Sequence, residues 1–111
     1  MAHRVLVHVD EGGDKPQSVV QNVENLLDDV EDAQIELVAH GPGIAALERD
    51  GELSERVEAL GRRGVRLAAC GNTMSAQELG PGDLVEGAEV VPSGVGELVR
   101  REAEGWLYVR P

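Results

Sequence analysis

The sequence is poor in several residue types that normally carry chemistry or stability. Its 111 residues include one cysteine, one tryptophan, one tyrosine and no phenylalanine. A single cysteine excludes an internal disulfide and any metal cluster held by several cysteines. The core must therefore be built from valine, leucine, isoleucine and alanine, which suit a buried sheet flanked by helices. A chain of this length predicts one domain, spanning residues 1–111.

Long apolar runs and basic residues are also scarce. No apolar run approaches the roughly 20 residues needed to cross a bilayer, and residues 1–13 lack the pattern of a secretory signal, so we expect a cytoplasmic protein. Twenty-one acidic residues face only ten basic ones, which makes the net charge -11, and Lys15 is the one lysine. This charge repels nucleic acid and anionic membranes, so we expect neither as a partner.

Strand and helix patterns alternate along the chain. The expected strands cover 4–9, 34–39, 65–69, 89–91 and 106–109. The expected helices cover 16–31, 44–47, 53–62, 73–79 and 95–104, with Asp14 and Ser54 as candidate caps. Strands separated by helices predict right-handed crossovers in a parallel sheet. We therefore expect an α/β fold with three layers, α/β/α, around a five-stranded, mainly parallel sheet.

The first three expected strands end at chemically interesting residues. Asp10, His40 and Cys70 recur with a period of about thirty residues, which matches one strand-helix-strand step. Sites in parallel sheets form beyond the carboxyl ends of the strands. The candidate site residues at this edge are Asp10, His40, Gly41, Cys70, Asn72, Thr73, Ser93 and Gly94.

Cys70 follows a short apolar strand and precedes a helix. With Asn72 or Thr73 as the helix cap, the sulfur would lie near the positive end of the helix dipole, which lowers the pKa of a thiol. A buried, purely structural cysteine is the alternative interpretation. The preceding alanines provide no cationic partner, so an arginine at 62, 63 or 66 would reach the sulfur only through folding or from a neighbouring subunit.

The three histidines have different expected roles. His3 is expected at the surface, His8 as a hydrogen-bonded core residue, and His40 as the candidate for proton handling near the site. Their spacing is not typical of a metal site, although folding could bring His8, His40 and Asp10 together. We expect no metal and no cofactor.

Two glycine-rich turns precede helices, at 41–43 and 93–96. Exposed N–H groups there could receive an anion, but such turns more often let a strand reverse into a helix, and neither matches a nucleotide-binding fingerprint. The acidic stretches 24–36 and 97–104 are interpreted as solvated helix faces.

Several segments together resemble a known family. They are HVDE (8–11), AHGPGI (39–44), CGNTM (70–74), the pair Asp83-Leu84, VVPSGVGEL (90–98) and GWLYVRP (105–111). In this order they resemble the DsrE/DsrF-like family of small sulfur-relay proteins, and in particular a branch of stand-alone, poorly characterised members. The resemblance spans nearly the whole chain.

The resemblance implies a homo-oligomer, either a trimer or a hexamer, in which Cys70 carries sulfur as a persulfide. In such relays sulfur passes to or from a small sulfur-carrier protein that serves tRNA thiolation or sulfur oxidation. We therefore expect a sulfurtransferase-type sulfur carrier. The alternative is a non-catalytic, homo-oligomeric binding module that holds a small ligand or a partner at the same edge of the sheet.

Overall fold

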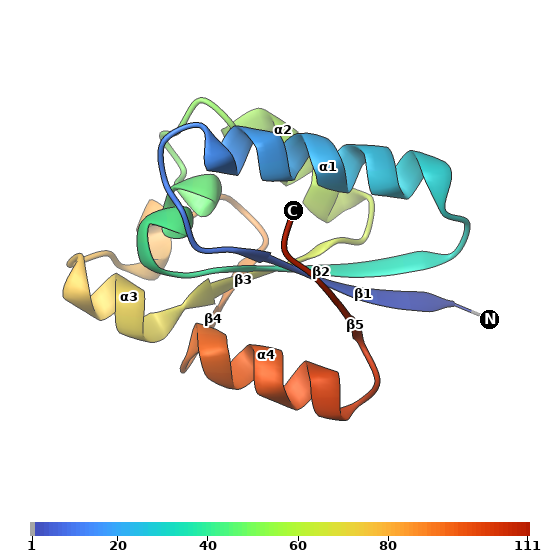
Figure 1. Cartoon of the computed structure of the whole chain (residues 1–111). Coiled ribbons are helices and arrows are strands. Elements are labelled where there is room, and N and C mark those ends of the chain that lie inside the picture. Colours follow the sequence, from blue (N-terminus) through green and yellow to red (C-terminus); the bar gives the residue numbers. More distant parts are fainter. Residues whose placement is uncertain (1) are drawn as a thin grey trace.

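The chain folds into three layers, with one sheet between two layers of helices (Figure 1). The computed structural model describes residues 2–111. The strands are β1 (His3–Val9), β2 (Ala33–Ala39), β3 (Arg66–Cys70), β4 (Ala88–Val91) and β5 (Leu107–Val109). Their order across the sheet is β4-β3-β2-β1-β5, and every neighbouring pair is parallel. The expected three-layer α/β/α fold with a five-stranded sheet is confirmed.

The helices cover both faces of this sheet. They are α1 (Lys15–Asp29), α2 (Ser54–Arg62), α3 (Gly71–Ala76) and α4 (Gly94–Ala103), with 3-10 helices η1 (Gly41–Leu47) and η2 (Pro81–Asp83). Helices α1 and α2 lie over one face, α4 lies over the other, and α3 extends from the end of β3 (Figure 1). Across residues 2–111, no helix has the length and apolar character needed to cross a membrane.

The N-termini of α1 and α2 are capped differently from what the sequence predicts. Asp14 is the N-cap residue of α1, but its side chain makes no capping hydrogen bond. The N-cap residue of α2 is Leu53, so Ser54 is the first residue of the helix and not its cap. Both Asp14 and Leu53 already have helical backbone angles, whereas a capping side chain works from an extended backbone. The expected helical turn at 44–47 belongs to the 3-10 helix η1.

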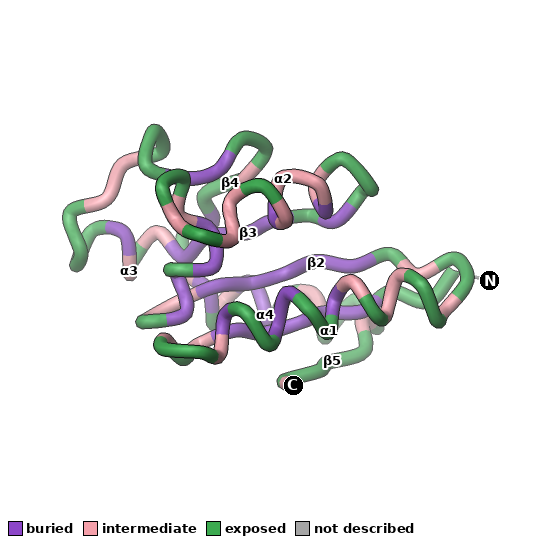
Figure 2. The backbone as a smooth tube through the Cα atoms, turned by 90° about the horizontal axis from the view of Figure 1, so that it is seen from above, coloured by how far each residue is buried: buried purple, intermediate pink, exposed green. Residues whose placement is uncertain are grey.

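The two faces of the sheet have different cores. Alternate residues of a strand point to opposite faces, so each strand contributes one set of side chains to each layer. The face beneath α1 and α2 carries the larger cluster, which includes Val5, Val7, Val9, Ile35, Leu37, Ala39, Leu67 and Ala69. The face beneath α4 carries a small cluster of Leu6, Val38, Ala68, Val91 and Leu98. Figure 2 shows that β2, in the centre of the sheet, is buried along most of its length.

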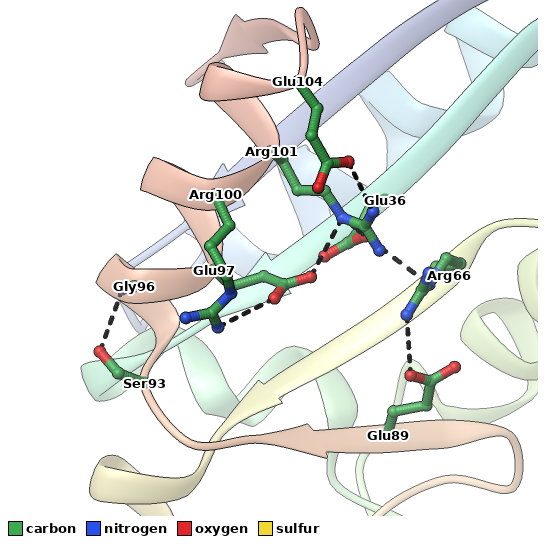
Figure 3. A network of polar contacts seen from close by, with 9 residues as sticks. All are labelled: Glu36, Arg66, Glu89, Ser93, Gly96, Glu97, Arg100, Arg101 and Glu104. Carbon is green, nitrogen blue, oxygen red and sulfur yellow. Dashed lines mark hydrogen bonds and ion pairs between the residues drawn. The ribbon is translucent and has the colours of Figure 1, made fainter.

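Two buried acidic residues meet between α4 and the sheet, Glu36 from β2 and Glu97 from α4 itself. Glu36 is fully buried and Glu97 is 6% exposed, so the interpretation of the acidic stretches as solvated helix faces is wrong for these two residues. The Nε of Arg101 donates to Glu36 Oε1 at 2.9 Å and to Glu97 Oε2 at 3.2 Å (Figure 3). Glu36 is buried because it belongs to the central strand and shares the α4 face with Val38.

The two carboxyl groups have pKa values that are shifted in opposite directions. Burial raises the pKa of Glu36 to about 7, and the neighbouring Glu97 carboxyl adds to the rise. Contact with Glu36 is the main cause of the lowered pKa of Glu97. Glu36 therefore takes up a proton more readily than Glu97, and its Oε2 has no hydrogen-bond partner among residues 2–111.

Candidate functional site

Cys70 ends β3 and is itself the N-cap residue of α3. Its backbone is extended, and its Sγ accepts a hydrogen bond of 3.4 Å from the backbone N–H of Thr73. The expectation that Asn72 or Thr73 caps this helix is therefore wrong. The helix starts at once at Gly71, and the sulfur occupies the position that a serine or aspartate oxygen usually takes.

A shell of hydrogen-bond donors surrounds the sulfur. Burial alone would raise the pKa of the Cys70 thiol, but hydrogen bonds from the Thr73 hydroxyl and from the N–H groups of Thr73, Gly94 and Asn72 outweigh it and lower the pKa. These bonds stabilise the thiolate, which is the nucleophilic form of cysteine. The lowered pKa agrees in direction with the sequence-based expectation, although local hydrogen bonds are its cause.

The three candidate arginines lie away from this shell. Arg63 pairs with Asp28 at 3.2 Å, and Arg66 lies at the opposite end of β3, where it pairs with Glu89 at 2.9 Å. Arg62 ends α2, just before the start of β3, and so lies at that opposite edge as well. Within one chain, the thiolate is therefore stabilised by N–H and O–H donors and not by these cations.

Gly94 separates Cys70 from His40. A Cβ atom built on Gly94 would lie 3.0 Å from the Cβ of His40 and 3.2 Å from the Cβ of Cys70. The two side chains therefore start within about 6.2 Å of each other, on either side of a glycine at the first turn of α4. The absence of a side chain at residue 94 permits this close approach.

A chain of hydrogen bonds runs from His40 into the sheet. His8 Nε2 lies 2.9 Å from His40 Nδ1, and His8 Nδ1 lies 2.7 Å from the hydroxyl of Tyr108. His8 is buried as expected, and this burial, followed by the charge of His40, lowers its pKa. The neutral imidazole of His8 thus connects β5 to the edge of the sheet where Cys70 lies.

Asp10 lies at the same edge and is held by the C-terminal segment. Arg110 donates to both carboxylate oxygens of Asp10, at 3.1 and 3.2 Å. Partial burial would raise the pKa of Asp10, but this guanidinium contact lowers it on balance. One ligand atom each of Asp10, His8 and His40 lies within 4.8 Å of the others. Folding therefore assembles the cluster that their spacing in the sequence does not reveal.

The remaining candidate residues lie at this edge with structural contacts of their own. Ser93 caps α4, where its Oγ accepts from the N–H of Gly96 at 3.1 Å. The N–H of Gly41 donates to Thr73 Oγ1 at 2.8 Å. Asn72 is exposed beside the sulfur. Sequence reasoning included Tyr108 and Arg110 in the segment GWLYVRP but missed their contacts with His8 and Asp10, because these partners lie about a hundred residues away along the chain.

Known proteins share this fold and much of this sequence. The sequence profile of the DsrE/DsrF-like family matches residues 12–111. The solved structure of MTH1491, a protein of unknown function from Methanobacterium thermoautotrophicum, superposes with a TM-score of 0.94 at 45% sequence identity, covering 98% of this chain and 99% of that one. No curated protein matches the chain. On the profile match and the shared fold, the chain belongs to the DsrE/DsrF-like family.

Proposed function

We propose that this protein carries sulfur as a transient persulfide on Cys70 and passes it to a partner protein. Membership of the DsrE/DsrF-like family suggests sulfur relay at the level of the family. The observation that carries the proposal for this chain is the position of Cys70 at the N-terminus of α3, where its Sγ accepts from the N–H of Thr73 at 3.4 Å. Hydrogen bonds at this position lower the pKa of the thiol in spite of its burial.

The shell suits each step of sulfur transfer. The Cys70 thiolate attacks the outer sulfur of a donor persulfide, the S–S bond of the donor breaks, and the donor leaves as a thiolate. Cys70 then holds a persulfide, whose outer sulfur is attacked by an acceptor thiolate. The Cys70 thiolate leaves and the cycle closes without an external oxidant or reductant. Hydrogen bonds from Thr73, Asn72 and Gly94 stabilise Cys70 both as the nucleophile and as the leaving group.

We propose a small sulfur-carrier protein as the partner and a homo-oligomer, trimeric or hexameric, as the working form. Exposed apolar side chains on the two edge strands and on α4 support assembly, namely Val90 on β4, Val95 and Val99 on α4, and Leu107, Tyr108 and Val109 on β5. Strand β5 is an edge strand with one free side, which subunit contact would protect. A cytoplasmic location stays a prediction from the sequence.

Cyanolysis tests the proposal. The protein is treated with polysulfide, freed of excess donor by gel filtration and mixed with cyanide, which removes the outer sulfur of a persulfide as thiocyanate. We expect one thiocyanate per chain from the wild type and none from Cys70→Ser. Equal thiocyanate from both proteins, or none from the wild type, would contradict the carrier and favour the alternative, a non-catalytic binding module at the same edge.

A further inference from the structure

We propose that His8, Asp10 and His40 form a binding site for one divalent transition-metal ion of the Zn²⁺ or Co²⁺ type. The three residues come from the ends of the neighbouring strands β1 and β2, and one ligand atom of each lies within 4.8 Å of the others. This inference goes beyond sulfur transfer, because it involves neither the thiol nor the helix that the thiol caps.

The distance between the two ring nitrogens is close to that of a metal site. His8 Nε2 and His40 Nδ1 are 2.9 Å apart. Two nitrogens that bind one ion at about 2.0 to 2.1 Å lie roughly 3 to 3.5 Å apart, so the rings must separate slightly and turn until both lone pairs point at the ion. In the absence of an ion, the two rings share a proton at this position. Metal binding displaces that proton from between them.

Tyr108 supplies the support that a metal-binding histidine needs. Its hydroxyl lies 2.7 Å from His8 Nδ1. When the hydroxyl accepts the Nδ1 proton, the lone pair of Nε2 is free and directed at His40. Histidine ligands of metals commonly donate their second N–H to such a partner, which fixes the tautomer and the orientation of the ring.

The donor set selects the class of ion. Two imidazoles and one carboxylate suit Zn²⁺, Co²⁺ and Fe²⁺, whereas Ca²⁺ and Mg²⁺ prefer oxygen ligands alone. Asp10 and His40 are both partly exposed, so an ion can reach the cluster from solvent. Three protein ligands leave a coordination position open.

Arg110 is the competitor for Asp10. Its Nη2 lies 3.0 Å from Asp10 Oδ1, and a metal ion would have to take an oxygen from this ion pair. The Arg110 side chain is about half exposed and also contacts Glu11 at 3.4 Å, so it has another acidic partner when Asp10 turns to the ion. Removal of this cation should therefore tighten metal binding.

The test is a titration of tag-free protein with Co²⁺, followed by absorption, and displacement of Co²⁺ by Zn²⁺. We expect one ion per chain for the wild type, at least tenfold weaker binding for His40→Ala and for Asp10→Asn, and tighter binding for Arg110→Ala. His3→Ala is the matched control, because His3 is exposed at the other end of β1, and it should bind as the wild type does.

Cys70→Ser separates this site from a thiolate site. The variant should keep full Co²⁺ binding, and the wild type should already lack the charge-transfer band that a sulfur ligand would produce. The proposal is overturned if the wild type binds no ion, if Asp10→Asn and His40→Ala bind as tightly as the wild type, or if Cys70→Ser abolishes binding. The Co²⁺ titration does not require sulfur on Cys70, so its result is independent of the proposed sulfur relay.

Discussion

The backbone N–H of Gly41 donates a hydrogen bond of 2.8 Å to the hydroxyl oxygen of Thr73. This bond joins the turn after β2 to the first turn of α3. Because the oxygen is occupied as an acceptor, the hydroxyl proton of Thr73 is free to point at the sulfur of Cys70. The contact between Gly41 and Thr73 therefore holds in place a residue whose hydrogen bonds lower the pKa of the Cys70 thiol.

The first prediction concerns Thr73. Thr73→Val removes the hydroxyl at nearly constant volume, so the pKa of Cys70 should rise and alkylation near neutral pH should slow. Thr73→Ser keeps the hydroxyl and should restore the wild-type rate. The rate of alkylation against pH measures both variants. An unchanged midpoint in Thr73→Val would show that the hydroxyl does not act on the sulfur.

The second prediction concerns the close approach at Gly94. In Gly94→Ala, the new methyl group would lie 3.0 and 3.2 Å from the Cβ atoms of His40 and Cys70. We expect a loss of about 1 to 3 kcal/mol in the free energy of unfolding, as at other overpacked sites, together with altered thiol reactivity. Gly82→Ala is the control, because its Cβ would meet nothing within 4 Å. Chemical denaturation of both variants measures the difference, and equal stability would refute the packing argument.

The third prediction is a pH dependence of stability from Glu36. Its pKa is raised from 4.5 to about 7 in the folded state, so its contribution is fully present below about pH 4.5 and is lost as the pH rises through 7. The lowered pKa of Glu97 acts in the opposite direction, but only in the acidic range below its ordinary value. The lowered pKa values of His8 and Cys70 act in the opposite direction closer to neutral pH, so the Glu36 effect is read as a difference from a variant that lacks the carboxyl group. That difference in the free energy of unfolding should change by on the order of 2 kcal/mol between about pH 5 and pH 8.

Glu36→Gln isolates this effect, because glutamine keeps the shape and cannot ionise. Its stability should lack the fall with rising pH that Glu36 causes in the wild type over this range. Glu89→Gln, an exposed partner of Arg66, serves as the control and should leave the pH dependence unchanged. Parallel pH profiles for the wild type and Glu36→Gln would show that the pKa of Glu36 is not raised by folding.

Much of the fold could be predicted because local patterns and burial agree. Val19, Val20 and Val23 repeat at helical spacing and are all buried in α1. The short apolar segments of β1, β2 and β3 lie in the centre of the sheet, where both faces are covered. Because parallel strands end at a common edge, the strand pattern alone predicts that Asp10, His40 and Cys70 lie at one edge of the sheet.

The rest depends on contacts between distant segments. Tyr108 reaches His8 because β5 pairs with β1 in a register that places Tyr108 opposite Leu6. Nothing local in the sequence specifies that register. Glutamate is usually found at the surface, so the sequence does not predict that Glu36 is buried. Its position on the α4 face of a central strand is what buries it. Cys70 was not expected as a helix cap, because capping rules are built on oxygen side chains.

The fourth prediction concerns assembly. We expect a trimer or hexamer that covers exposed residues such as Val99 and Leu107. Each chain carries a net charge of -11, so repulsion between subunits should weaken the assembly at low ionic strength. Light scattering at low and high salt measures both effects. A monomer at every concentration and salt level would refute the oligomer, whereas an oligomer indifferent to salt would remove only the electrostatic argument.

The mass of the intact protein after exposure to a sulfur donor tests the persulfide on Cys70 most directly. Cys70→Ser nearly conserves volume and should remain folded, as circular dichroism can verify, so it serves as the matched protein. We predict that the wild type gains one sulfur atom, that a reducing thiol removes it, and that Cys70→Ser gains none. An unmodified wild type, or the same gain in Cys70→Ser, would contradict the account.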